Sequence, residues 1–139
     1  MKEETLRDIG EFECIHRIAH DLIYRPELVK LGTGDDGAVF MTPCGYDEVI
    51  STDTMVEGIH FTKRTMSAAD TGYHLCAVNF SDMAAMGAEP VSFVISAALP
   101  GDLSITWIES CYDGIRECCR EHSVNLLGGD ITGSKQGVI

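Results

Sequence analysis

The sequence is short of positive charge. It contains 22 Asp and Glu residues but only 10 Lys and Arg residues, so its formal net charge is −12. Nucleic acids and anionic membranes are bound by basic surfaces, and we therefore expect neither as a partner. A phosphorylated substrate would also be repelled unless metal ions stood between its phosphates and the protein.

The sequence also lacks targeting and membrane-spanning segments. Its first ten residues, MKEETLRDIG, contain no apolar leader core, and no apolar run reaches the length needed to cross a bilayer. The six cysteines lack the spacing of a disulfide framework, because Cys118 and Cys119 are adjacent and Cys14, Cys76 and Cys111 fall on apolar faces of predicted helices. We expect reduced, mostly buried thiols in a cytoplasmic protein.

The length of 139 residues suits one domain, over residues 1–139, and the hydrophobic content of 45% is ordinary for a globular protein. Apolar spacing and turn residues predict helices over 11–23, 67–86 and 104–122, and strands over 38–41, 48–52, 91–99 and 125–127, with a further strand beginning at 137–139. Helices and strands mix without a regular βαβ alternation. This order favours an α+β fold with a mixed or antiparallel sheet packed against helices.

Two glycine-rich segments imitate nucleotide-binding motifs. Gly32, Gly34 and Gly37 match G-x-G-x-x-G, but a strand is predicted to follow and two aspartates stand where a pyrophosphate would approach. Either a simple acidic turn or a metal-mediated phosphate site fits this segment. GGDITGSK, at residues 128–135, is not a Walker motif, because its lysine and hydroxyl residue are in the wrong order.

Aspartates recur at the ends of predicted strands, in loops and on one helix: Asp35, Asp36, Asp53, Asp82 and Asp130. Carboxylates gathered in one place repel each other, so such a cluster usually holds divalent cations, and Mg²⁺ prefers oxygen ligands and substrate phosphates. We expect these side chains to converge on magnesium. An acidic turn at Asp36 and a turn in which Asp53 caps local amides are the structural alternatives.

Asp82 is the most informative of the five. Aspartate is unfavourable inside a helix, and here it shares a face with Asn79 and is followed by the small residues Ala84 and Ala85. A solvated helix face would also explain it. His60, in the loop after Asp53, could reach the same site, although a lone loop histidine more often has no such role.

Taken together, several segments resemble thiamine-monophosphate kinase, of the superfamily that includes aminoimidazole ribonucleotide synthetase. They are GEFECIHRI, GTGDDGAVF, STDTMVEGIHF, AVNFSDMAAMGAEP and LLGGDIT, in the family's order. The resemblance spans almost the whole chain and corresponds to the family's N-terminal domain. It implies the N-terminal-domain fold of that superfamily, with a sheet completed by pairing in a homodimer.

The resemblance implies ATP-dependent phosphorylation of thiamine phosphate to thiamine diphosphate. By motif position it implies Mg²⁺ ligands at Asp36, Ser51, Thr52, Asp53, Asp82 and Asp130, ATP contacts at Gly129 and Asp130, and a contact of His60 with thiamine phosphate. No general base is assigned, because the acceptor is already an anionic phosphate oxygen.

The chain departs from the family pattern after Asp130. The family usually continues Thr-Thr-Arg-Gly, whereas this chain has Ile131, Thr132, Gly133 and Ser134, so an arginine that would meet phosphates is missing. Family members are also about twice as long, and their second domain completes the substrate pocket. Two alternatives therefore stay open: an ATP-dependent enzyme of the same superfamily with another acceptor, of the synthetase or hydrogenase-maturation type, and a non-catalytic dimerisation or metal-binding module.

Overall fold

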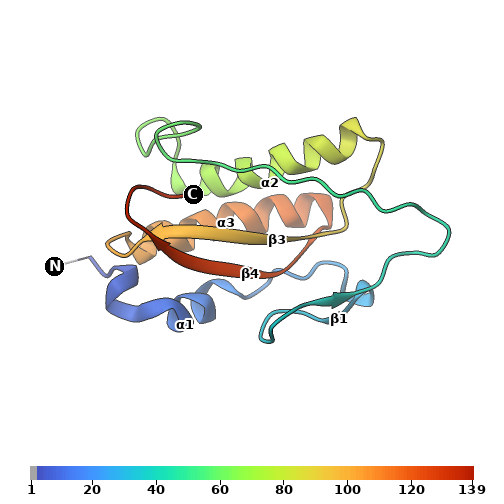
Figure 1. The fold of residues 1–139 in the computed structure, drawn as a ribbon, viewed down its shortest axis with the longest axis horizontal. Helices are drawn as coiled ribbons and strands as arrows, with labels where there is room; N and C mark the ends of the chain where they lie inside the picture. Colours follow the sequence, from blue (N-terminus) through green and yellow to red (C-terminus); the bar gives the residue numbers. More distant parts are fainter. Residues whose placement is uncertain (1–2) are drawn as a thin grey trace.

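The fold contains three helices and two small sheets, seen in a computed structural model that describes residues 3–139 (Figure 1). The elements are α1 (Leu6–Ile18), the short 3-10 helix η1 (Pro26–Leu28), β1 (Val29–Leu31), β2 (Val39–Phe40), α2 (Ala68–Ala85), β3 (Ser92–Pro100), α3 (Ile105–His122) and β4 (Asn125–Ser134).

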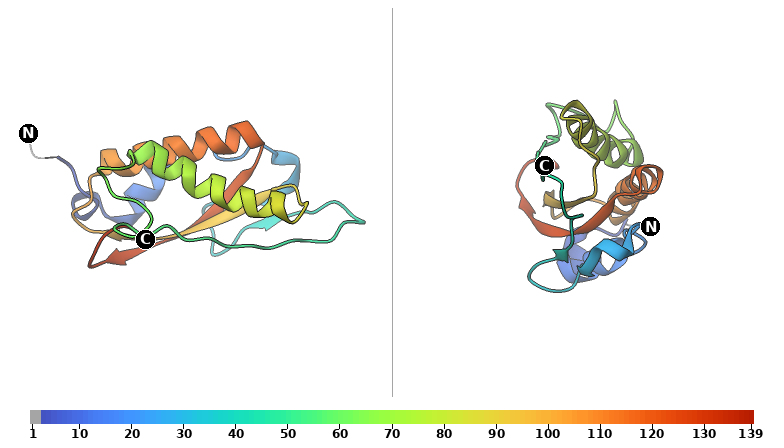
Figure 2. Two further views of the ribbon diagram at one scale, coloured as in Figure 1. Left: turned by 90° about the horizontal axis from the view of Figure 1, so that it is seen from above. Right: turned by 90° about the vertical axis from the view of Figure 1, so that its right-hand side faces the viewer.

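The main layer of the fold is the parallel pair β3 and β4, which α3 connects. Helices α2 and α3 cover one face of this pair, as Figure 2 shows, and apolar side chains of all four elements form a shared core. The second sheet is the antiparallel hairpin of β1 and β2. The predicted fold class is confirmed, but the two long strands form one βαβ unit, which the order of predicted elements did not indicate.

Helices α2 and α3 touch backbone to backbone at two glycines. A Cβ atom on Gly72 would lie 1.9 Å from the carbonyl oxygen of Cys111, and one on Gly114 would lie 1.9 Å from that of Ala69. No other residue type fits at these positions without moving a helix. The two helices can therefore pack closely enough to bury Cys76, Cys118 and Cys119 between them and the sheet.

The ends of α2 follow the predicted signals. At its start, the Ser67 hydroxyl oxygen accepts from the Asp70 N–H at 3.1 Å and the hydroxyl donates to the Asp70 carboxylate at 2.6 Å. At its end, Gly87 takes a positive φ of 68° and the Ala88 N–H donates back to the Met83 carbonyl. The predicted bounds of this helix, 67–86, are confirmed to within one residue at each end.

Helix α1 differs from the prediction over 11–23. It begins at Leu6, where the Asp8 carboxylate accepts from both the N–H and the hydroxyl of Thr5, and it ends at Ile18. Gly10 interrupts it with a φ of 77°, so the helical register changes before Glu11. As a result Phe12 is 87% exposed, and the core receives Leu6, Cys14 and Ile18 from this helix.

Strand β4 is longer than the predicted strand over 125–127 and continues to Ser134. Its pairing with β3 advances two residues from Phe93 to Ile95 but three from Leu126 to Gly129, which is a β-bulge at the two glycines of the GGD segment. A Cβ atom on Gly129 would lie 1.8 Å from the carbonyl oxygen of Ile95, so the close approach requires glycine. Pairing with β3 overrides the turn-forming tendency of these glycines.

Residues 48–52, predicted as a strand, are extended but belong to no sheet. A strand is stabilised by hydrogen bonds to a neighbour, and none of the backbone groups of residues 47–52 has such a partner within residues 3–139. The side chain of Ile50 is accordingly 91% exposed. The prediction of a strand is wrong for this segment because the local sequence does not show which edge it would pair with.

All six cysteines are free thiols, as predicted, and Cys14, Cys76, Cys118 and Cys119 are buried. Burial raises the pKa of the Cys111 thiol to about 12. Cys44, in the loop after β2, is exposed. Within the described residues, every helix is too short or too polar to cross a membrane.

Replacing Gly114 by Ala tests the contact between α2 and α3. Helix propensity alone would stabilise the protein by about 1 kcal/mol. The overlap with the Ala69 carbonyl must instead force the helices apart, so we expect the free energy of unfolding to fall by about 3 kcal/mol in urea titrations. Gly37→Ala is the control, because nothing lies within 4 Å of its added Cβ, and its stability should change by less than about 0.5 kcal/mol. A Gly114→Ala protein as stable as the parent would contradict the contact.

Candidate functional site

One face of α2 holds the extended segment that carries Ser51 and Asp53. The Ser51 hydroxyl donates to the Asp82 carboxylate at 3.1 Å, and the Asp53 N–H donates to the Asn79 side-chain oxygen at 2.9 Å. Asn79 is in turn held by a 2.8 Å bond from its amide nitrogen to the Leu75 carbonyl. The shared face of Asn79 and Asp82 noted in the sequence is therefore where α2 meets the segment.

The Asp53 carboxylate is exposed to solvent and caps its own turn, since its Oδ1 atom accepts from the Thr54 N–H at 2.9 Å. This local bond is the structural alternative considered for Asp53. It occupies one carboxylate oxygen and leaves the group accessible. Ser51, Thr52, Asp53 and Asp82 thus present oxygen atoms, all exposed, at one end of the contact with α2.

Asp130 lies on a different element, strand β4. It follows the bulge at Gly128 and Gly129 and pairs with Ser96 of β3. Ile131, the next residue, packs into the core beneath the sheet, so alternation along the strand places Asp130 on the sheet face turned away from the helices, where it is exposed. The bulge therefore sets the position of the Asp130 side chain.

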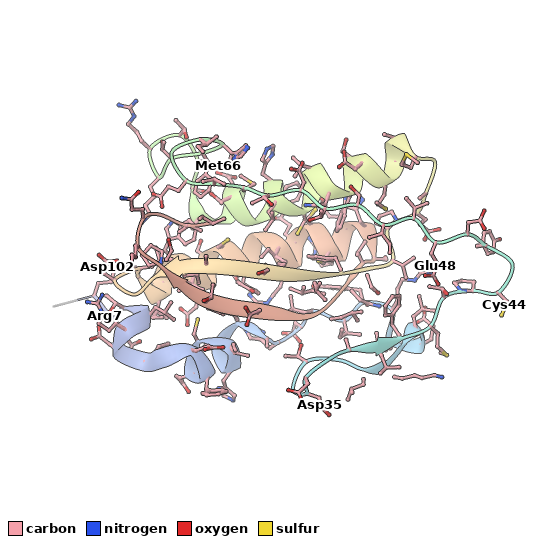
Figure 3. All side chains as sticks on the ribbon, in the orientation of Figure 1. Arg7, Asp35, Cys44, Glu48, Met66 and Asp102 are labelled. Atoms are coloured by element: carbon pink, nitrogen blue, oxygen red, sulfur yellow. The ribbon has the colours of Figure 1, made fainter. Side chains whose placement is uncertain are left out.

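Asp36 lies in the turn between β1 and β2. Its N–H donates to the Asp35 carboxylate at 2.9 Å, and Thr33 is tied to β4 by a 3.4 Å bond to the Leu127 carbonyl. Figure 3 places Asp35 at the tip of this hairpin, on the opposite side of the β3–β4 pair from Met66, which precedes α2. Strand β2 follows the glycines, as predicted, and a dinucleotide motif is excluded by that order.

The expectation that the aspartates converge within one chain is wrong. Within residues 3–139, no group of three or more His, Cys, Asp or Glu side chains is arranged to hold a metal ion. Ser51, Asp53 and Asp82 come together through α2, whereas Asp36 is on the hairpin and Asp130 is on β4. The reason is topological: these residues lie on four different parts of the fold, namely the extended segment, α2, the hairpin and β4, and sequence alone does not fix the distances between them.

His60 lies in the turn between Glu57 and Phe61, and its side chain is exposed. Its Nδ1 atom lies 3.0 Å from the Val56 backbone nitrogen, which can only donate. Nδ1 is therefore the acceptor, and the neutral ring carries its proton on Nε2. A donor N–H is thus directed away from the backbone.

Sequence reasoning missed Asn125, the first residue of β4, whose side chain holds the backbone of Tyr24 and Arg25. It is fully buried, and its oxygen accepts from the N–H groups of Tyr24 and Arg25 at 2.8 and 2.7 Å. Its amide donates to the Arg25 carbonyl at 3.1 Å. A polar residue between the apolar Val124 and Leu126 in a predicted strand was the available signal.

Comparison with known proteins places the chain in a family. The model of the AIR synthase related protein family, N-terminal domain, matches residues 34–139. This match covers α2, β3, α3, β4 and every residue of the candidate site. The chain belongs to the AIR synthase related protein family and contains its N-terminal domain.

Curated relatives are thiamine-monophosphate kinases. The enzyme of Synechococcus elongatus is 41% identical over 101 residues, which is 73% of this chain and 31% of the relative. That of Bacillus subtilis is 38% identical over 122 residues, 88% of this chain and 37% of the relative. The chain thus spans about a third of the length of the curated relatives it matches.

Solved structures show the same likeness. A thiamine-monophosphate kinase from Stenotrophomonas maltophilia superposes with a TM-score of 0.77 at 35% identity, over 94% of this chain and 40% of that one. A structure described as AaThiL complexed with AMPPCP and TMP superposes with a TM-score of 0.60 at 33% identity, over 63% of this chain and 28% of that one.

Proposed function

We propose that residues 1–139 form a single ATP- and Mg²⁺-binding domain that serves the ATP-dependent phosphorylation of thiamine phosphate to thiamine diphosphate. The observation that carries the proposal is the identity of 38–41% with curated thiamine-monophosphate kinases over most of this chain. The complex of a structural relative with AMPPCP and TMP supports the choice of ligands. The six free thiols suit a cytoplasmic location.

The donor chemistry of the site fits magnesium. Ser51, Thr52, Asp53 and Asp82 supply only hydroxyl and carboxylate oxygens, which are the ligands that Mg²⁺ prefers, and Asp36 and Asp130 add two more carboxylates. Since Asp36 and Asp130 lie on elements other than those that carry Ser51, Asp53 and Asp82, these groups would contact the bound phosphates through separate Mg²⁺ ions. Bound Mg²⁺ would neutralise the phosphates of ATP and of the acceptor, which the net charge of −12 otherwise repels.

Each side chain then has a positioning role. Asn79 holds the backbone of Asp53, and Asp82 holds the hydroxyl of Ser51, so the segment presents its oxygens in one orientation. Gly129, without a side chain, allows ATP to approach the backbone beside Asp130. Phosphoryl transfer depends mainly on such positioning and on charge neutralisation, and the anionic acceptor oxygen needs no general base.

His60 suits the phosphate of thiamine phosphate. Its Nδ1 atom is occupied by the Val56 N–H, so the donor on Nε2 is available to an anion. The chain has only 10 Lys and Arg residues that could bind a phosphate by charge. The Nε2–H group of His60 can bind one by a hydrogen bond instead.

We also propose that the chain forms a homodimer. Large apolar side chains are exposed on the hairpin and on the extended segment, with Val39 48%, Phe40 45%, Tyr46 81% and Ile50 91% exposed. Apolar patches of this kind mark interaction surfaces, and a second copy of the chain could bury them.

Sedimentation equilibrium tests the dimer. We expect the mass of two chains for the parent protein and the mass of one for Phe40→Glu, because a buried charge without a partner opposes association. Leu31, on β1, is 41% exposed, and Leu31→Met serves as the control that keeps the apolar surface. A parent protein that sediments as one chain at all concentrations would refute the dimer.

Gly133 favours a second candidate function. It stands where the family pattern has an arginine, so the chain loses a phosphate contact there. A non-catalytic dimerisation or metal-binding module would tolerate that loss. An enzyme of the same superfamily with a different acceptor is the other alternative.

Calorimetric titration with AMPPCP, with and without Mg²⁺, separates these functions. We expect magnesium-dependent binding by the parent chain and binding at least about tenfold weaker for Asp53→Asn and Asp82→Asn, because each loses a charged oxygen ligand. Both variants should fold as stably as the parent without metal, since removing a carboxylate relieves repulsion.

Asp102→Asn is the matched control, because it removes the same charge from an exposed position in the connection between β3 and α3 (Figure 3). Its affinity should equal that of the parent chain. Binding by the parent that does not depend on Mg²⁺, or an equal loss in all three variants, would contradict the assigned ligands. Absence of nucleotide binding would leave only the non-catalytic module.

A further inference from the structure

Two segments of this acidic chain carry only positive charge. Residues 58–69 contain Lys63 and Arg64, and residues 131–139 contain Lys135. Neither segment contains an Asp or Glu residue, so together they have a formal charge of +3 in a chain whose net charge is −12. An anion that the chain as a whole repels would therefore be attracted to these segments, provided that they lie together in the fold.

The fold joins the two segments. The Glu57 N–H donates to the Val138 carbonyl at 2.9 Å, and the Val138 N–H donates back to the Glu57 carboxylate at 3.0 Å. Phe61 and Val138 are buried in the same core cluster. Figure 1 shows the loop before α2 and the turn after β4 at the end of the molecule where α2 and α3 begin. We call residues 58–69 and 131–139 the cationic end.

The cations of this end are available to a ligand. Lys63, Arg64 and Lys135 are exposed, and among the described residues none of them forms an ion pair. Arg17 and Arg25, in contrast, each bind two carboxylates. The charge of the cationic end is therefore not neutralised by ion pairs of its own.

The carboxylates that flank residues 58–69 in the sequence have other partners. Glu57 accepts from the Val138 N–H, and Asp70 accepts from the Ser67 hydroxyl at 2.6 Å. Both bonds belong to the local structure, since one joins the two segments and the other is part of the cap of α2. Neither carboxylate is thus paired with a cation of this end.

Lys63 is placed by an aromatic pair. Its Nζ atom lies 5.8 Å from the ring centroid of Trp107, and that ring stacks on Phe61 with centroids 6.5 Å apart and an interplanar angle of 17°. Trp107 is in the first turn of α3, which contains no acidic residue. The positive end of the helix dipole therefore adds to the charge of Lys63.

We propose that the cationic end binds the phosphate group of the acceptor and brings it to His60. This inference rests on the proposed function. His60 belongs to residues 58–69, and its Nε2–H is directed away from the backbone. Charges of opposite sign raise the local concentration of a ligand and speed its association. Three exposed cations suit one phosphate group, whereas a nucleic acid would require a broad basic face.

The fluorescence of Trp107 tests the proposal, because the chain contains a single tryptophan and Lys63 lies over its ring. The full chain is titrated with inorganic phosphate at low ionic strength without Mg²⁺. We expect a saturable change in emission that disappears in about 1 M salt, where charges are screened within about 3 Å. The apparent Kd should be at least about threefold weaker in Arg64→Gln and in Lys135→Gln, which both leave Lys63 over Trp107.

Lys30→Gln is the matched control, because it removes the same charge from an exposed position on β1. Its affinity for phosphate should equal that of the parent chain. No saturable change in the parent would overturn the proposal. So would equal weakening in all three variants, which indicates a response to net charge alone, or unchanged affinity in both Arg64→Gln and Lys135→Gln.

Thiamine phosphate and thiamine separate this inference from the proposed function. We expect thiamine phosphate to bind at least as tightly as inorganic phosphate, with the same loss in Arg64→Gln and Lys135→Gln, and thiamine to leave the emission unchanged. Binding of inorganic phosphate without binding of thiamine phosphate would reject that acceptor but support the cationic end as an anion site. Unchanged affinity for both anions in the two variants, with Mg²⁺-dependent binding of AMPPCP intact, would reject the cationic end and leave the proposed function standing.

Discussion

The backbone contact between α2 and α3 is the constraint from which the rest of the site follows. Gly72 and Gly114 let the helices approach until each is in contact with a carbonyl of the other. This approach fixes the rotation of α2, with Cys76 and Phe80 turned into the core. Asn79 and Asp82 then face the extended segment and hold it through Asp53 and Ser51. The two glycines in the core, Gly72 and Gly114, thus determine where polar groups of α2 lie on the surface.

Local signals were sufficient where an element is stabilised by its own residues. The Ser67 cap and Gly87 delimit α2, and the apolar spacing around Ile115 identifies α3, so both helices could be predicted closely. Prediction failed where the outcome depends on a distant partner. Pairing with β3 carries β4 through Gly128 and Gly129 to Ser134, and residues 48–52 are extended without a neighbour to make them a strand. Gly10 shifts the register of α1, which left Phe12 on the surface.

In the candidate site, too, the local sequence identifies the residues, whereas their arrangement depends on distant parts of the chain. The sequence identifies Asp36, Asp53, Asp82 and Asp130 as candidates, because they recur in loops, at strand ends and on one helix, but it contains no information on the distances between them. The fold brings Ser51, Asp53 and Asp82 together and keeps Asp36 and Asp130 on other elements. Acidic groups on separate elements could bind two extended ligands, such as ATP and thiamine phosphate, through several Mg²⁺ ions. They are less well placed to share a single Mg²⁺ ion. The phosphates, with their metal ions, would connect groups that the polypeptide leaves apart.

The chain belongs to the AIR synthase related protein family, and it resembles curated thiamine-monophosphate kinases at 38–41% identity. The physics of the site does not identify the molecule that accepts the phosphoryl group, since any phosphate anion could bind to Mg²⁺ held by the residues of the candidate site. Phosphorus NMR of the native protein, purified from its source and supplied with ATP, Mg²⁺ and thiamine phosphate, tests it directly. The account predicts the signals of thiamine diphosphate and ADP in equal amounts. Consumption of ATP only with a different acceptor, or no product from thiamine phosphate, would contradict it.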